Sequence, residues 1–204
     1  MAKGMSDESL FGQYCEGASE LLEVLINRYR QELYAFLAKF LGDATLAQDV
    51  FQETFLQIHL SKHTFNQARR FKPWLFAVAA NKARDALRAR KRHRTVSIDA
   101  SLGSDRSEGG GSFVDLIASG EPTAAEKFSQ AEAAQLVREV VATMPEHLRE
   151  VLLLAYFQRM AYKDIAQIVG LPLGTVKSRL HAALGSFARL WARKTSAKLN
   201  GDLP

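Results

Sequence analysis

The most informative stretch of this chain is GLPLGTVKSRLHAAL, residues 170–184. Its glycines, lysine and serine suggest a phosphate-binding loop. That loop has the pattern G-x-x-x-x-G-K-[ST], in which the lysine follows the second glycine directly and reaches the phosphates. Here Thr175 and Val176 separate Gly174 from Lys177, so the lysine would point away from a bound phosphate. The spacing therefore excludes a nucleotide-binding loop.

The same stretch contains the start of an amphipathic helix. From Val176 onward, apolar residues recur at steps of three and four, while the opposite face is polar and basic. Upstream, residues 162–169 have the pattern of a shorter helix, Gly170 suits the position that ends it, and Pro172 prevents the two helices from joining. This arrangement predicts a helix-turn-helix, with an ordinary helical hairpin in a bundle core as the alternative. The expected apolar face contains Val176, Leu180, Ala183, Leu184, Phe187, Leu190 and Trp191.

Composition narrows the class of protein. With 204 residues, of which 47% are hydrophobic, the chain can form one or two globular domains. A single cysteine, Cys15, excludes a disulfide framework and a cysteine-based zinc site. The N-terminus has no apolar signal segment, and the longest apolar run, 151–157, is too short to span a bilayer. The five histidines lack metal-ligand spacing, and no nucleophile–base pair is recognisable. We therefore expect a cytoplasmic protein that is not an enzyme and has no cofactor, metal or small-molecule substrate.

Charge alternates along the chain in four blocks. The net charge is −5 over residues 1–60, +10 over 61–94, −6 over 95–146 and +6 over 147–204. A charged run is usually a solvated face, but aromatic residues interrupt the first basic block, and this combination favours nucleic acid binding. Because acidic and basic blocks alternate, we expect the two halves of the chain to pack together when no partner is bound. The aromatic residues in the basic block are Phe65, Phe71, Trp74 and Phe76.

The periodicity predicts an all-α protein with two small helical domains joined by a flexible linker. Gly42 ends the first long apolar stripe, Asp43 is a good N-cap for the next helix, and Pro73 fits the first turn of a third. Pro145 interrupts the helical pattern of the second domain. The stretch around 101–112 is rich in Ser, Gly and Asp, as flexible linkers are. The expected boundaries are an N-terminal tail 1–18, a first domain 19–94, a linker 95–125, a second domain 126–194 and a C-terminal tail 195–204.

Three segments carry a family resemblance. LAQDVFQETF (46–55) resembles D-x-x-Q-[ED]-x-F, and FKPWLFAVAANKARDALRARKR (71–92) resembles F-x-x-W-L-x-x-I-A-x-N-x-x-x-D-x-x-R. These are motifs of region 2 in the extracytoplasmic-function (ECF, group 4) sigma factors of bacterial RNA polymerase. The segment 144–180 resembles the whole of region 4 in the same family. The resemblance implies a region 2 helical bundle and a region 4 helix-turn-helix, which direct core RNA polymerase to promoters and assist promoter melting in transcription initiation.

The resemblance assigns roles within the first domain. The loop that Phe65 opens is implied to hold a base flipped from the −10 non-template strand, and the helix after it reads the −10 element. An acidic, amide-rich face in the helix before the loop is implied to dock on the β′ clamp of core polymerase. The residues implied for −10 binding and melting are Phe65, Asn66, Arg69, Arg70, Trp74, Asn81, Lys82, Arg84 and Arg88. Those implied for the core polymerase contact are Asp49, Gln52 and Glu53.

In the second domain, the resemblance places the helix after Gly174 in the major groove of the −35 element. The implied contacts are Thr175, Lys177, Ser178, Arg179 and His181. Some positions depart from the family pattern. Ala161 offers no side-chain N-cap, Ala182 and Leu184 stand where arginine is frequent, and Ala80 replaces another frequent arginine. The −35 sequence is therefore left open.

The prediction from sequence is thus an ECF sigma factor. Its expected partners are core RNA polymerase, through the β′ clamp and β subunits, promoter DNA and an anti-sigma factor. The alternative is a helix-turn-helix transcriptional regulator that binds duplex DNA without polymerase. That alternative explains residues 147–192 but leaves the segment 43–94 without a role.

Overall fold

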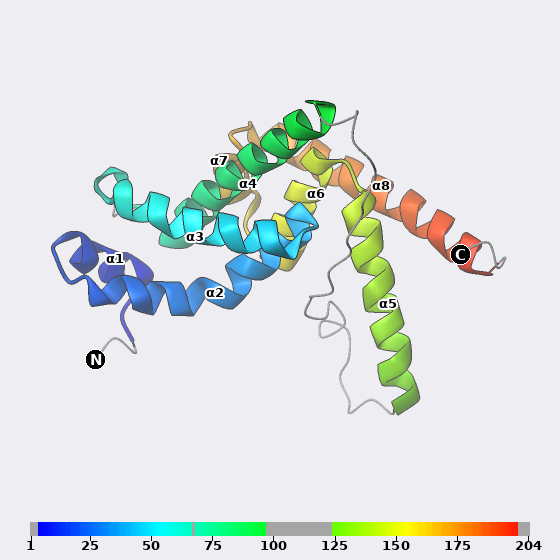
Figure 1. The fold of residues 1–204 in the computed structure, drawn as a ribbon, viewed down its shortest axis with the longest axis horizontal. Coiled ribbons are helices and arrows are strands. Elements are labelled where there is room, and N and C mark those ends of the chain that lie inside the picture. The colour runs from blue at the N-terminus through cyan, green and yellow to red at the C-terminus, as the bar shows by residue number, and fades with distance from the viewer. Residues whose placement is uncertain (1–3, 67, 97–123, 200–204) are drawn as a thin grey trace.

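The structure is a computed structural model that describes residues 4–66, 68–96 and 124–199 (Figure 1). Every element within these ranges is helical, so the predicted all-α fold with two helical units is confirmed. Most of the expected linker, residues 97–123, and the end of the expected C-terminal tail, residues 200–204, lie outside the described residues. The elements are α1 (Asp7–Cys15), α2 (Glu20–Leu41), α3 (Ala44–Leu60), η1 (Lys62–Thr64), α4 (Phe71–Val96), α5 (Ala124–Thr143), α6 (Glu146–Leu152), the π-helix η3 (Leu153–Phe157), α7 (Tyr162–Val169) and α8 (Leu173–Leu199).

Helices α1 to α4 form the N-terminal unit. The apolar stripe of α2 is buried, as predicted, and α2 ends at Gly42 with a left-handed φ of 66°. The Asp43 carboxylate then accepts a hydrogen bond from the Leu46 amide at 3.0 Å, which caps α3. This short turn brings α3 back along α2, and α4 packs against both helices. A basic helix and an acidic helix are thereby held side by side on one scaffold.

Helix α1 lies where the sequence suggested only an N-terminal tail. Ser6 caps its first turn, and Leu10, Phe11 and Tyr14 are buried. The backbone amide of Phe71, at the start of α4, donates a hydrogen bond to the Glu8 carboxylate at 2.8 Å. The N-terminal segment is therefore part of the core of this unit. It was missed because a nine-residue helix presents too few turns for its apolar period to stand out.

Helices α5 to α8 form the C-terminal unit. Helix α5 stops just before Pro145, as predicted, because proline has no amide hydrogen to continue the ladder. Helices α7 and α8 form the predicted helix-turn-helix, and Gly170 between them has a left-handed φ of 67°. No side chain caps α7 at Ala161, in agreement with the sequence. Helix α8 packs along α5, α6 and α7.

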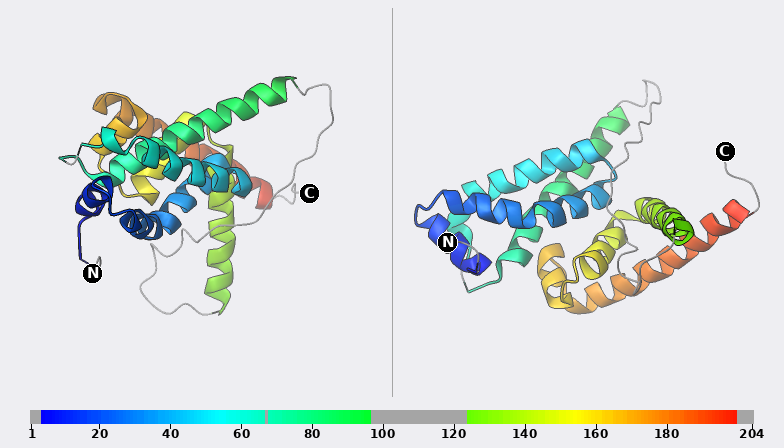
Figure 2. Two further views of the ribbon diagram at one scale, coloured as in Figure 1. Left: turned by 60° about the vertical axis from the view of Figure 1, so that its left-hand side comes forward. Right: turned by 90° about the horizontal axis from the view of Figure 1, so that it is seen from below.

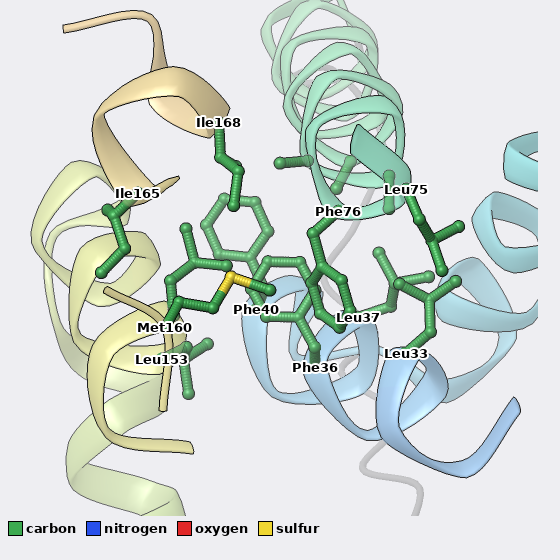
Figure 3. Close-up of a cluster of buried hydrophobic side chains, with 14 of the residues drawn as sticks. Leu33, Phe36, Leu37, Phe40, Leu75, Phe76, Leu153, Met160, Ile165 and Ile168 are labelled. Atoms are coloured by element: carbon green, nitrogen blue, oxygen red, sulfur yellow. The ribbon is translucent and has the colours of Figure 1, made fainter. Parts of the chain in front are cut away.

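The two units pack against each other (Figures 2 and 3), which confirms the expectation drawn from the charge blocks. Helix α4 lies against α7, and α2 lies against η3, α5 and α6. Figure 3 shows Phe36 and Phe40 of α2 and Phe76 of α4 facing Leu153 and Met160 of the other unit. All five side chains belong to one continuous buried cluster. None of the described helices combines the length and the apolar character needed to cross a membrane.

Candidate nucleic-acid interface

Helix α8 presents the polar face that the sequence predicted. Lys177, Ser178 and His181 are exposed near its start, whereas Thr175 and Arg179 are half-buried. The hydroxyl of Ser178 donates a hydrogen bond to the Thr175 carbonyl at 3.0 Å. On the opposite face, three residues of the predicted stripe anchor the helix, and these are Val176, Leu180 and Ala183. The helix therefore presents polar and basic side chains to solvent, while its opposite face is fixed in the core.

The sequence prediction was wrong for one residue of the apolar face of α8. Leu184 is 44% exposed, and Ser186 is buried instead. At 3.6 residues per turn, Leu184 lies about 80° around the helix from Val176, at the edge of the buried stripe. A spacing of three and four residues includes positions at the edge of an apolar stripe. Whether a side chain at the edge is buried depends on the neighbouring helices.

Helix α4 carries the predicted basic and amide residues, but most of them are engaged within the chain. Asn81 and Arg88 are exposed, while Lys82 and Arg84 are half-buried. Arg88 pairs with Asp85 at 2.6 Å, and the Lys82 ammonium lies 3.8 Å from the Glu53 carboxylate of α3. Arg84 donates one hydrogen bond to the Asn81 side-chain oxygen and another to Glu150 of α6.

The loop between η1 and α4 is built on an aromatic cluster. The half-buried Phe65 ring lies 4.9 Å from Trp74, 5.1 Å from Phe11 and 5.9 Å from Phe71, measured between ring centroids. The cluster therefore includes two buried rings, Phe11 of α1 and Phe71 of α4, as well as half-buried Trp74. Phe65 is thus packed from several sides in the free chain.

Beyond Phe65, the described part of the loop is polar and open. The side-chain oxygen of Asn66 accepts a hydrogen bond from the Ala68 amide at 2.9 Å, which fixes a local turn. Arg69 and Arg70 are exposed. Arg70 nevertheless forms an ion pair with Asp164 of α7.

The predicted polymerase-contact residues all lie on one exposed face of α3. Asp49, Gln52 and Glu53 are exposed. Leu56 and Leu60 continue the same face and are 58% and 61% exposed. The sequence reasoning missed these two leucines, although Leu56 follows Glu53 by three residues and Leu60 follows Leu56 by four, which was a readable signal.

Two buried carboxylates of the C-terminal unit were also missed. Glu150 is buried beside Arg84 of α4, and Asp164 is buried beside Arg70. Burial raises the pKa of the Glu150 carboxyl, while Arg84 and, more weakly, Arg179 oppose that rise. No signal in the sequence singled out either residue, because each is an ordinary polar position until the two units meet.

The chain resembles known sigma factors over both units. Residues 25–93 match Sigma-70 region 2, and residues 134–186 match Sigma-70, region 4. The chain is 30% identical over 177 residues to the RNA polymerase sigma-H factor of Pseudomonas aeruginosa, which is 87% of this chain and 89% of that protein. It is 25% identical to the ECF RNA polymerase sigma factor SigW of Bacillus subtilis, over 83% of this chain and 88% of that one.

A solved structure shares the fold. CnrH, in complex with the cytosolic domain of CnrY, superposes with a TM-score of 0.64 at 22% identity, covering 93% of this chain and 99% of that one. The match to region 2 rejects the alternative of a plain helix-turn-helix regulator, since such a regulator has no region 2. The chain therefore belongs to the ECF group of the sigma-70 family: it is an RNA polymerase sigma factor that acts in transcription initiation, and it is not an enzyme.

Proposed function

We propose a division of this sigma factor activity among three surfaces. Helix α3 recruits core RNA polymerase, α4 with the loop before it reads and opens the −10 element, and α8 reads the −35 element. The observation that carries this division is the separation of exposed side chains: acidic and apolar on α3, basic on the loop and α8. DNA repels the first kind of surface and attracts the second.

The α3 surface suits a protein partner. Exposed leucines beside carboxylates and amides provide apolar area at the centre and polar groups around it, as protein interfaces do. We define this surface as the clamp face, made of Asp49, Gln52, Glu53, Leu56 and Leu60. Its proposed partner is the β′ clamp of core polymerase, with the β subunit contacted elsewhere.

Replacing Asp49 and Gln52 together with alanine is expected to weaken binding to core polymerase about tenfold, since truncating a residue that contributes to an interface costs more than about 1 kcal/mol. Both side chains are exposed, so the isolated protein should remain folded. Direct binding of labelled protein to core polymerase measures the effect, with circular dichroism as the check on folding. A double variant at Glu20 and Glu23, exposed on α2, is the matched control. Wild-type affinity of the Asp49/Gln52 variant for core would contradict the assignment.

The loop and α4 suit a single strand leaving the duplex. A base that leaves the duplex loses its stacking energy. An aromatic or polar pocket can replace that stacking, and basic side chains beside the pocket can bind the strand's phosphates. Phe65 and Trp74 supply the aromatic edge, and Arg69 and Arg70 supply the charge. Because Phe65 packs on buried Phe11, its truncation would also disturb the core. Arg69, exposed and without such packing, is the cleaner test.

Replacing Arg69 with alanine is expected to reduce open-complex formation about fivefold, since one polar contact to the strand contributes about 1 kcal/mol. Binding to a −35 duplex should not change. Permanganate footprinting of the non-template strand with reconstituted holoenzyme measures the opening, and a pre-melted −10 bubble should partly restore it. If wild-type protein with core polymerase never opens a promoter while the protein alone binds DNA specifically, the proposed roles of the loop and α4 are wrong.

An anti-sigma factor is a further proposed partner, and the cytoplasm is the proposed location. The sigma factor RpoE from Bartonella quintana, solved in complex with the anti-sigma factor NepR, superposes on this chain with a TM-score of 0.63 at 20% identity, covering 82% of this chain and 94% of that one. Core polymerase and the promoter, the other two partners, are in the cytoplasm.

A further inference from the structure

The −10-reading surface and the C-terminal unit lie against each other in this structure. Arg84 of α4 donates to Glu150 of α6 at 2.5 Å, and Arg70 of the loop pairs with Asp164 of α7. A third ion pair, at 2.8 Å, joins Lys91 of α4 to Glu146 of α6. Glu150 and Asp164 are 5% and 9% exposed, whereas the Arg84 side chain is 24% exposed and that of Arg70 is 63% exposed. The Arg84–Glu150 pair is therefore enclosed where the units meet, and the Arg70–Asp164 pair lies at the edge of the interface.

The two units cannot stay packed in this way while the chain binds both the −10 and the −35 element of a promoter. The −10 and −35 elements are about 25 base pairs apart, which is roughly 80 Å of B-DNA. Helices packed face to face have axes only about 8–10 Å apart. With α4 packed on α7, the two readers cannot occupy both elements at the same time. The closed arrangement must therefore come apart before the promoter is bound.

We propose that the free chain is autoinhibited: Glu150 and Asp164 act as intramolecular substitutes for DNA phosphates and pair with two −10-reading arginines, Arg84 under the C-terminal unit and Arg70 at its edge. This inference rests on the proposed roles of Arg84 and Arg70. Carboxylates are suitable substitutes because arginine binds carboxylate and phosphate oxygens with the same guanidinium geometry. The contact is selective, since Lys177 on α8 remains exposed. The C-terminal unit thus engages Arg84 and Arg70 of the −10 surface, whereas Lys177, Ser178 and His181 of the −35 surface stay exposed.

The interface also has features of a contact that opens. The Arg149 guanidinium lies over the Phe40 ring at 5.7 Å, and its Nε is buried without a hydrogen-bond partner among the described residues. The side-chain oxygen of Gln158 is also buried without a hydrogen-bond partner in the described part of the chain, and Gln158 borders a groove that is lined by residues of α2 as well. Burial lowers the pKa of Arg149, and it lowers the pKa of Lys39, whose ammonium lies over the Phe157 ring. Opening would return these polar groups to water and offset part of the loss of apolar packing.

The test uses the full chain with Glu150→Gln and Asp164→Asn combined, which keep the side-chain shapes and remove both charges. Donor and acceptor dyes on cysteines introduced at Asn27 of α2 and Ala192 of α8, both exposed and both outside the clamp face, report the distance between the units in a Cys15→Ser background. We expect high energy transfer in the free wild type, lower transfer in the double variant and low transfer in wild-type holoenzyme.

The matched control removes two carboxylates that lie away from these ion pairs. It combines Glu23→Gln with Glu139→Gln. Glu23 is exposed on α2, and Glu139 of α5 pairs with Lys194 of α8, within the C-terminal unit. The control changes the net charge as much as the double variant does, and its energy transfer should equal that of the wild type.

A second readout is the affinity of the free protein for a single-stranded −10 non-template oligonucleotide. If the open fraction rises from about 5% to about 50%, the apparent Kd falls about tenfold. The affinity for a −35 duplex should change less than about twofold, because Lys177, Ser178 and His181 are already exposed in the closed state. Asp164→Lys, which would repel Arg70, should act in the same direction and serves as a second variant.

Equal energy transfer and equal oligonucleotide affinity in wild type and both variants would overturn the inference. So would low energy transfer in the free wild type. Open-complex formation by wild-type holoenzyme is measured in parallel, because it depends on the proposed roles of α4 and the loop but not on the closed state. Normal promoter opening with no response of the variants means that only the autoinhibition is wrong. No promoter opening means that the proposed roles fail.

Discussion

Replacing Phe36 with alanine is expected to lower the free energy of unfolding by about 3–5 kcal/mol, the usual cost of removing a buried phenylalanine ring. Phe36 is fully buried, stacked on Phe40 with a centroid distance of 5.8 Å and tilted against Phe76 at 5.4 Å. It lies in the part of the core where the two units meet (Figure 3). Its loss therefore leaves a cavity that neighbouring helices from both units cannot easily fill.

Chemical denaturation followed by circular dichroism measures this effect. Leu56→Ala, on the exposed clamp face, is the control and should change the free energy of unfolding by less than about 0.5 kcal/mol. A loss below about 1 kcal/mol for Phe36→Ala would mean that the ring is not held in a packed core. The comparison separates apolar side chains that support the fold from those that are available to a partner.

Replacing Lys177 with alanine is expected to remove about 1–3 kcal/mol of discrimination between the preferred −35 sequence and a mismatched one. Lys177 is exposed in the first turns of α8, where a recognition helix reaches base edges in the major groove. A lysine that contacts only phosphate gives a different result: binding weakens equally for all sequences, and the slope of log K against log salt falls by about one. Competition between promoter variants at two salt concentrations distinguishes the two cases.

The matched control for Lys177 is Arg189→Ala. Arg189 is also basic and exposed, but it lies twelve residues further along α8, beyond the turns that face the groove. We expect it to leave the −35 discrimination unchanged. Loss of discrimination in both variants would indicate that the basic face acts through its overall charge, and the assignment of base reading to Lys177 would be wrong.

Much of the local structure was readable from the sequence because its causes are local. Gly42 and Gly170 adopt the left-handed conformation that ends a helix, and Asp43 caps α3 with its own side chain. The apolar period along α2 predicted its buried face for the same reason, since neighbouring turns of one helix define it. The motifs of regions 2 and 4 then identified the family, which the similarity to known sigma factors confirmed.

Positions that depend on a second element were less predictable. Leu184 has the spacing of a core residue but is 44% exposed, since no neighbouring helix among the described residues covers the edge of the stripe. Phe65 could equally have been a core ring or a free one, and it packs on α1, an element that the sequence analysis treated as a tail. The roles of the predicted DNA- and polymerase-binding residues stay predictions, because no partner is bound to test them.

The charge blocks show most clearly where sequence reasoning ends. Alternating blocks predicted that the two units pack together, and they do. They did not indicate the pairs. Arg84 meets Glu150 and Arg70 meets Asp164, two carboxylates within a segment whose net charge is positive. An ion pair between residues 66 or 94 positions apart depends on how two cores pack, and only the tertiary structure decides that packing.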